Sequence, residues 1–218
     1  MKSSAQRGFS LVEIMVVVAI MAIILSVAAP SLAKYLNGLS VRSAAESVLN
    51  GLQVARGEAI RSNNTVILQI VDSLENSCAE TAQGKHWVVS HCPAAGACGG
   101  AIDKQAVPPV NCNDSDPVIL AKGSFEAGDR VEVDLGGSAA LCYSALGRVS
   151  ANASNCPAGT IDPSGSGGGS FAINVRHTDE ACMADGGSVR CLRIAVGTAG
   201  QAKLCDPSIT SSDDPRGC

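Results

Sequence analysis

The sequence predicts an α+β fold: one long N-terminal helix, partly embedded in a membrane, packs against an antiparallel β-sheet domain with disulfide-closed loops. Three observations lead to this prediction. An apolar stretch runs from Ile14 to Ala29. At Thr65 the spacing of hydrophobic residues changes from three or four to two, the change expected where a helix gives way to a strand. All ten cysteines lie after residue 77.

The apolar stretch is interrupted only by Ser26, and with Leu11 and Val12 it approaches the ~20 apolar residues that cross a bilayer. One carboxylate, Glu13, lies near its start. A charge within a membrane segment is costly, so Glu13 invites a functional interpretation.

An ordinary secretory signal would have an apolar core of only ~7–15 residues and a small-residue cleavage site after it. Here the core is longer, and Ala28-Ala29-Pro30 is a poor site. We therefore expect cleavage before the core, between Gly8 and Phe9, so that the helix stays in the mature protein. An uncleaved signal anchor is the alternative.

The helix is expected to continue past Pro30, with a kink there, and to end near Ser62-Asn63-Asn64. This gives a helix over about 9–61. One face of its second half is predicted to carry Leu32, Leu36, Leu39, Val48, Leu52, Ala55 and Ala59. The strand from Thr65 is expected to bury one face. Further strands are predicted at 87–90, 118–121, 130–135, 139–143, 171–175, 190–196 and 202–204.

The segment Arg7-Gly8-Phe9-Ser10-Leu11-Val12-Glu13 resembles the class III leader of type IV pilins and type II secretion pseudopilins. The resemblance implies that a prepilin peptidase cuts after Gly8, that Phe9 becomes the methylated amino terminus, and that Glu13 acts in assembly. The expected divisions are a leader at 1–8, a membrane and filament-core helix at 9–30, an amphipathic half at 31–62 and a periplasmic β-rich domain at 63–218.

Later residues are similar to the GspH/FimT group of minor pilins and pseudopilins. The helix ends in Ala55-Arg56-Gly57-Glu58-Ala59-Ile60-Arg61, and Tyr143 is followed by a Gly147-Arg148 turn. The last strands and the tail Asp214-Pro215-Arg216-Gly217-Cys218 resemble the group's C-terminal hairpin. This implies a pilin-like fold.

The cysteines of this exported chain indicate an oxidising compartment and up to five disulfide bonds. The connectivity is open in principle. The pairing that sequence proximity favours is Cys92–Cys98, Cys142–Cys156, Cys182–Cys191 and Cys205–Cys218, which leaves Cys78–Cys112.

Metal sites, cofactors and catalysis are not expected. His86, His91, Cys92 and Cys98 lie close together, but they lack a C-x-x-C pair, and exported cysteines usually oxidise. A calcium site at Asn111, Asn113, Asp114 and Asp116 lacks the glycine and terminal acid of an EF-hand loop. No nucleophile has convincing flanking residues or partners, which disfavours an enzyme.

DNA binding is possible but not favoured. The net charge is −4, and loss of the leader leaves 14 basic against 20 acidic side chains, which is not the balance of a nucleic-acid-binding protein. The local candidates are Arg176, Arg190, Arg193, Lys203 and Arg216. Asp206, Asp213 and Asp214 lie among them and weaken the positive potential.

The expected function is structural: a minor pilin that helps initiate or tip a type IV pilus. The alternatives are a minor pseudopilin of a type II secretion system and a pilus-tip DNA receptor. The expected partners are other pilin or pseudopilin subunits, the prepilin peptidase and the inner membrane. The protein would cross that membrane once, with its C-terminal domain in the periplasm, and enter a pilus or pseudopilus after assembly.

Overall fold

The computed structural model describes residues 10–103, 105, 108, 112, 117–124, 130–153, 155–157, 160–161, 170–211 and 213–218. Gly8, Phe9 and the calcium candidates Asn111, Asn113, Asp114 and Asp116 lie outside these residues. The elements, in chain order, are α1 (Leu11–Ser62), β1 (Val66–Val71), β2 (Gln83–Gly84), β3 (His86–Ser90), β4 (Ile119–Ser124), β5 (Val131–Asp134), β6 (Ala140–Tyr143), β7 (Ser170–His177), the 3-10 helix η1 (Met183–Asp185), β8 (Leu192–Gly197) and β9 (Ala202–Cys205).

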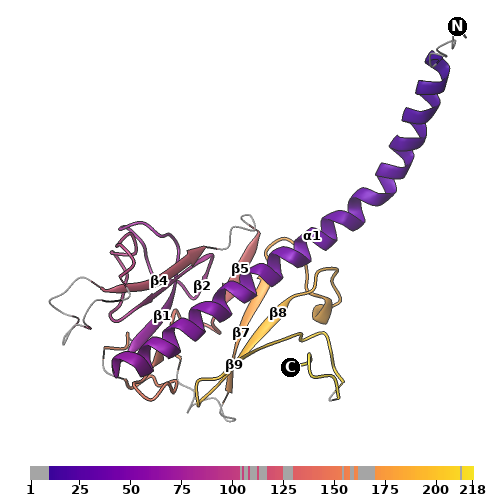
Figure 1. Ribbon diagram of the computed structural model, residues 1–218. Coiled ribbons are helices and arrows are strands. Elements are labelled where there is room, and N and C mark those ends of the chain that lie inside the picture. Colours follow the sequence, from indigo (N-terminus) through magenta and orange to yellow (C-terminus); the bar gives the residue numbers. More distant parts are fainter. Residues whose placement is uncertain are drawn as a thin grey trace, which may run out of the picture.

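Two antiparallel sheets form the domain, whereas the sequence predicted one. The first has the strand order β4-β3-β1-β6 and the second β2-β5-β7-β8-β9. The C-terminal half of α1 crosses both sheets and contacts strands of each (Figure 1). Its N-terminal half projects beyond the domain. The pilin-like α+β arrangement of a long helix on antiparallel sheets is thus confirmed.

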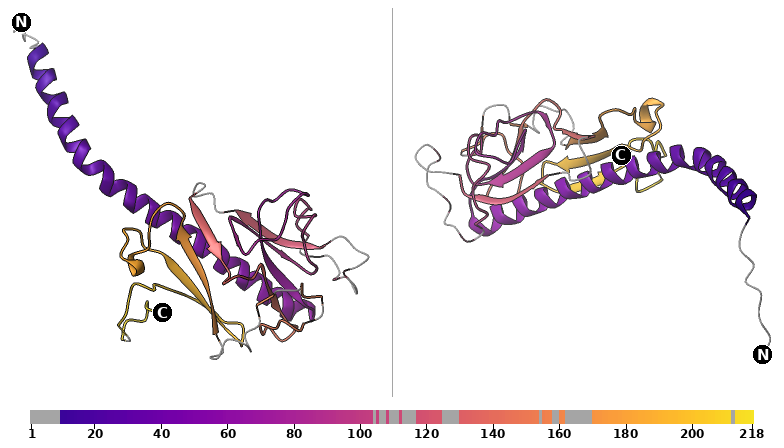
Figure 2. Two further views of the ribbon diagram at one scale, coloured as in Figure 1. Left: turned by 180° about the vertical axis from the view of Figure 1, so that it is seen from behind. Right: turned by 90° about the horizontal axis from the view of Figure 1, so that it is seen from above.

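The helix α1 is one continuous element. It begins after Ser10, whose hydroxyl accepts a hydrogen bond from the backbone N–H of Glu13, and it ends at Asn63, which has a left-handed conformation. Pro30 lies inside it and lacks the N–H that would bond to the preceding turn. The projecting half curves away from the line of the domain half (Figure 2), consistent with the kink expected at a proline.

The apolar face predicted for the second half of α1 is correct only from Val41 onward. Val48, Leu52, Ala55 and Ala59 are buried, but Leu32, Leu36 and Leu39 are 44–57% exposed. The prediction failed there because hydrophobic spacing identifies a face without showing how far the domain extends along it. The sheets cover α1 only beyond its first thirty residues (Figure 2).

Trp87 fixes the distance between α1 and the first sheet. Its indole ring lies against Gly51, where an added Cβ would be only 3.1 Å from the ring. The indole N–H donates a hydrogen bond of 3.0 Å to the Ser47 hydroxyl. Gly51 weakens the helix by about 1 kcal/mol relative to alanine, but it allows the Trp87 ring to pack closely against α1.

Strand β1 is buried on both faces, whereas its alternating sequence predicted one exposed face. All six residues from Val66 to Val71 are buried. One face packs against α1, and the other lies under a second cluster that includes Val88, Cys78 and Cys98. Central strands that are covered on both sides usually have continuous hydrophobic sequences. Five of the six residues of β1 are hydrophobic, and the polar Gln69 is buried with them, so period-two alternation was the wrong pattern to apply.

Five disulfide bonds are formed, and two of the pairings favoured from the sequence are wrong. Cys142–Cys156, Cys182–Cys191 and Cys205–Cys218 are confirmed. The pairings Cys92–Cys98 and Cys78–Cys112 are replaced by Cys78–Cys98 and Cys92–Cys112. Pairing by proximity in sequence failed because Cys78 and Cys98 meet in the small core beneath β1 and β3, where both are buried.

Candidate functional site

The most unusual surface is the projecting half of α1. The large apolar side chains from Leu11 to Val27 are 49–76% exposed. Over its most apolar part none of the helix is buried, and its length and composition suffice to cross a membrane. An exposed apolar surface of this extent needs a bilayer or another protein to cover it.

Glu13 lies at the first turn of this helix. Its backbone N–H is 3.2 Å from the Ser10 hydroxyl, the capping arrangement that Ser-x-x-Glu sequences favour. This cap was not predicted, although the spacing of Ser10 and Glu13 is the signal that could have revealed it. Within the described residues the Glu13 carboxylate forms no ion pair. A counter-charge for this carboxylate therefore has to come from outside the described residues.

At the other end of α1, Arg56 joins the helix to two distant turns. Its Nε donates to the carbonyl oxygen of Gly147 over 3.1 Å, and its Nη2 to that of Ala199 over 3.2 Å. Gly147 and Gly200 both have positive φ, at 69° and 83°. A Cβ at Gly200 would lie 2.0 Å from the Gly147 oxygen, so glycine is required where these turns meet.

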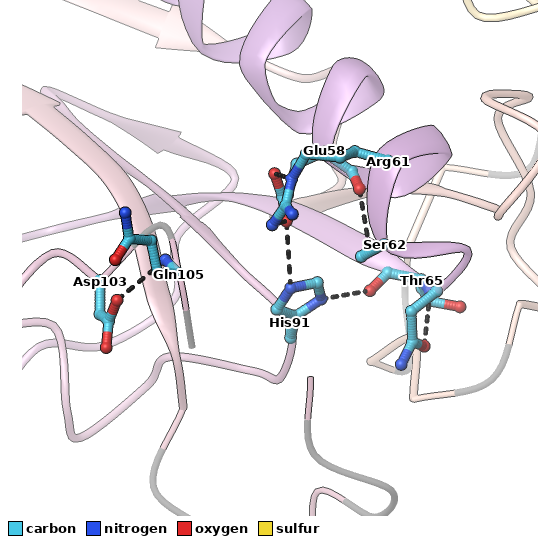
Figure 3. Close-up of polar contacts among 8 residues, drawn as sticks. Glu58, Arg61, Ser62, Thr65, His91, Asp103 and Gln105 are labelled. Atoms are coloured by element: carbon cyan, nitrogen blue, oxygen red, sulfur yellow. Dashed lines mark hydrogen bonds and ion pairs between the residues drawn. The ribbon is translucent and has the colours of Figure 1, made fainter. Parts of the chain in front are cut away.

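The same helix end holds a partly exposed ionic cluster (Figure 3). Arg61 donates two hydrogen bonds to the Glu58 carboxylate. The Nε2 of His91 lies 3.7 Å from the same carboxylate, and its Nδ1 lies 3.1 Å from the Thr65 carbonyl oxygen. The Nδ1 of this buried histidine is within hydrogen-bond distance of an oxygen, whereas its Nε2 faces the carboxylate from beyond that distance. The cluster ties the end of α1 to the segment after β3.

Together these contacts give structural roles to the helix motif noted in the sequence. Ala55 and Ala59 are buried against the sheets. Arg56 donates to the two turns at Gly147 and Ala199, and Glu58 lies beside His91. Tyr143, also noted in the sequence, is buried in the main core, and this burial raises the pKa of its hydroxyl. The motif residues at this end of the helix therefore join α1 to the domain.

The candidate DNA-binding side chains do not form one cationic surface. Arg176 pairs with Glu132, Arg190 with Asp206 over 2.9 Å, and Arg216 with Asp214 over 2.7 Å. Arg193 and Lys203 share one face of the β8–β9 ladder, where their partners are Cys205 and Ala195. Arg193 also donates to the side chain of Asn174. Neighbouring carboxylates therefore neutralise three of the five charges.

The zinc candidates are separated by the disulfide bonds. Cys92 pairs with Cys112 and Cys98 with Cys78, so neither offers a thiolate. His91 faces Glu58, and His86 begins β3. Among the described residues no group of three metal-ligating side chains is present.

A helix that is apolar and exposed at one end, carries a carboxylate in its first turn and forms the spine of a disulfide-closed β domain at the other end defines a type IV pilin-like protein. Residues 3–29 match the prokaryotic N-terminal methylation motif. Residues 44–200 match the family of the type II transport protein GspH. Because the second match spans more than half of the chain, the protein belongs to the GspH family of minor pilins and pseudopilins.

Two solved structures illustrate the likeness. The type IV minor pilin FimU of Pseudomonas aeruginosa is 14% identical, with a TM-score of 0.45 over 79% of this chain and 92% of FimU. The minor pseudopilin EpsH of the Vibrio cholerae type 2 secretion system is 13% identical, with a TM-score of 0.38 over 78% of this chain and 99% of EpsH. No curated protein sequence matches significantly. The family is described as a type II transport protein, and the two structures as a minor pilin and a minor pseudopilin.

Proposed function

We propose that the protein is a minor pilin that helps initiate or tip a type IV pilus. A prepilin peptidase removes residues 1–8, and Phe9 becomes the methylated amino terminus. The mature chain waits in the inner membrane with its β domain in the periplasm, and it then enters the filament through α1.

The observation that supports this proposal most directly is the exposed apolar half of α1 with its carboxylate. Between Glu13 and Lys34 the helix carries no charged residue. Lipid covers this apolar surface in the membrane, and the apolar helices of neighbouring subunits can cover it in a filament core. Transfer between the two environments therefore exposes little apolar area to water.

Glu13 sets the register of that transfer. A carboxylate within an apolar bundle is stable only when it meets an opposite charge. The amino terminus of a neighbouring subunit supplies that charge. The Ser10 cap holds the first turn of α1 in helical form, so the carboxylate is presented at a defined position.

The test compares Glu13→Ala with Ser10→Ala in sheared filaments. Glu13→Ala should leave leader cleavage intact but reduce incorporation at least tenfold, because the buried charge pair is lost. Ser10→Ala removes only the cap and should reduce incorporation far less. Normal incorporation of the Glu13 variant would refute the proposed role. Intact-mass and amino-terminal analysis of the membrane-extracted protein reports cleavage and methylation.

A pseudopilin of a type II secretion system is the second candidate, and the description of the matching family favours it. The two proposals share processing, anchoring and the role of Glu13. They differ in the phenotype of a deletion strain. Loss of surface pili with normal protein secretion supports the minor pilin, and the converse supports the pseudopilin.

DNA reception at the pilus tip is not favoured, because Arg176, Arg190 and Arg216 are paired with carboxylates. Gel shifts with the detergent-solubilised chain should show no salt-sensitive DNA binding. A shift that weakens with salt and is lost on charge reversal of Arg193 and Lys203 would instead establish a DNA receptor.

A further inference from the structure

A groove of about 760 Å³ lies between residues 34–42 of α1 and the C-terminal part of the domain. Its far wall includes Met183 of η1, the start of β8 and the segment closed by Cys205–Cys218. Figures 1 and 2 show η1 and the C-terminal segment at the end of the domain nearest the projecting half of α1. The groove therefore lies beside the end of the apolar segment, where that segment meets the domain.

The position of the groove along α1 places it at the surface of a membrane. The 20 residues from 14 to 33 are uncharged, and at ~1.5 Å per residue they span about the 30 Å of a hydrocarbon core. Lys34 and Tyr35 follow directly, and these are residue types that favour the membrane interface. Arg42 lies roughly 12 Å further along the helix, near the outer limit of the headgroups.

The lining of the groove combines apolar and cationic side chains. Tyr35 and Leu39 on α1 face Ile209 and the half-exposed Met183 of the C-terminal part. The cations in the lining are Lys34, Arg42, Arg190 and Arg216. An amphipathic lining of this kind matches a phospholipid, whose phosphate lies directly above its glycerol and acyl chains.

The charge of the groove is positive although that of the chain is negative. Arg42 pairs with Glu46, Arg190 with Asp206 and Arg216 with Asp214. Lys34 forms no ion pair among the described residues, so four cations meet three carboxylates. The pairs of Arg42 and Arg190 use Nε, which leaves the Nη groups, and guanidinium forks bind phosphate well.

We propose that this groove binds the headgroup of an anionic phospholipid while the protein waits in the membrane. The phosphate contacts Lys34 and the Nη groups of Arg42 and Arg190, and the apolar part of the lipid contacts Tyr35, Leu39 and Met183. The contact orients the β domain on the bilayer surface. The proposal rests on the membrane-anchored state of the proposed function, but it requires nothing of the filament.

The experiment places the photoreactive residue p-benzoylphenylalanine at Met183 in the full-length protein. The protein is reconstituted in vesicles of phosphatidylcholine alone or with 30 mol% phosphatidylglycerol, and lipid adducts are counted by mass spectrometry after irradiation. We expect the adduct yield to be at least threefold higher with phosphatidylglycerol and to fall in 0.5 M salt, since phosphate contacts are screened.

The charge test uses two matched pairs of substitutions. Lys34→Gln with Arg42→Gln removes two groove cations and should lower the yield to that of phosphatidylcholine alone. Arg148→Gln with Lys203→Gln removes two exposed cations outside the groove and should change nothing. Equal yields in both vesicles, equal effects of the two pairs, or crosslinks to a second protein chain in place of lipid would each overturn the proposal.

Filament incorporation of the wild-type chain separates this proposal from the proposed function. A wild-type chain that forms lipid adducts but never enters pili refutes the minor pilin alone. A wild-type chain that enters pili but gives equal adduct yields in both kinds of vesicle refutes only the lipid-binding role of the groove.

Discussion

The guanidinium of Arg56 donates a hydrogen bond to the carbonyl oxygen of Gly147, which lies 91 residues further along the chain. A second bond from the same side chain reaches Ala199. One residue near the end of α1 thus holds the turn after β6 and the turn between β8 and β9, and these turns belong to different sheets. Arg56 is the clearest point at which α1 joins the two halves of the domain.

We expect Arg56→Ala to lower the free energy of unfolding by about 1–3 kcal/mol, because hydrogen bonds from a charged donor are lost from a partly buried position. Arg56→Lys should be intermediate, since one ammonium cannot present a fork to two carbonyls. Denaturant unfolding of the oxidised, detergent-solubilised chain measures both. Arg42→Ala, which removes only an exposed pair, is the control, with an expected change below about 0.5 kcal/mol. Equal losses at Arg56 and Arg42 would contradict the linking role.

Gly200→Ala tests the contact between the same two turns. The added methyl would lie 2.0 Å from the Gly147 oxygen at a φ of 83°, so the turns must separate. Gly136→Ala is a matched control, because Gly136 has a φ of 68° but open space around it. The control should lose only about 1–2 kcal/mol from the left-handed conformation, and Gly200→Ala clearly more. Similar unfolding midpoints for the two variants would show that the turns separate easily.

Asp214 provides a prediction on pH. Hydrogen bonds from Arg216 lower the pKa of its carboxyl to about 2. A depressed pKa means that the pair stabilises the tail above the ordinary carboxyl range near 4, and that this effect is lost as the pH falls through about 2. NMR titration of the Asp214 side chain should have its midpoint there. In Arg216→Gln the midpoint should rise toward 3.8, the usual value. An unchanged midpoint would show that Arg216 does not cause the shift.

The disulfide connectivity can be checked by peptide mapping without reduction, which should recover Cys78–Cys98 and Cys92–Cys112. Replacing Cys78 and Cys98 by alanine should lower the free energy of unfolding by about 3–5 kcal/mol, from the opened loop together with the loss of buried sulfur packing. Replacing Cys205 and Cys218 should have a smaller effect, since Cys218 is exposed. Peptides linking Cys92 to Cys98 would restore the pairing favoured by sequence proximity.

Local patterns predicted most of the elements. The end of α1 was predicted from the helix-stop residues Ser62-Asn63-Asn64, and eight strands from period-two runs between turn residues. Strand β2 was missed because its two residues, Gln83 and Gly84, are too few to show a period. Hydrophobic spacing also could not show that Leu36 lies beyond the reach of the sheets, because the extent of packing is a property of the whole domain.

Of the two functional features, the leader motif with Glu13 could be predicted from local sequence, but the groove could not. The leader motif and Glu13 are contiguous in sequence, so a resemblance could identify them. The groove is assembled from residues near 34–42, 183–192 and 204–216, and no local spacing relates these segments. From the sequence, Arg190 and Arg216 were only candidate DNA-binding residues. Only the three-dimensional structure shows that both line the same groove as Lys34.

The unbroken course of α1 has a mechanical consequence. The apolar segment and the domain segment belong to one continuous, curved helix, so a pull on the end near Leu11 reaches the domain through that helix and not through a flexible linker. The load then falls in shear on the whole contact from Val41 to Ala59 at once. A contact loaded in this way must break over its whole length at once, so it resists extension better than one that opens residue by residue.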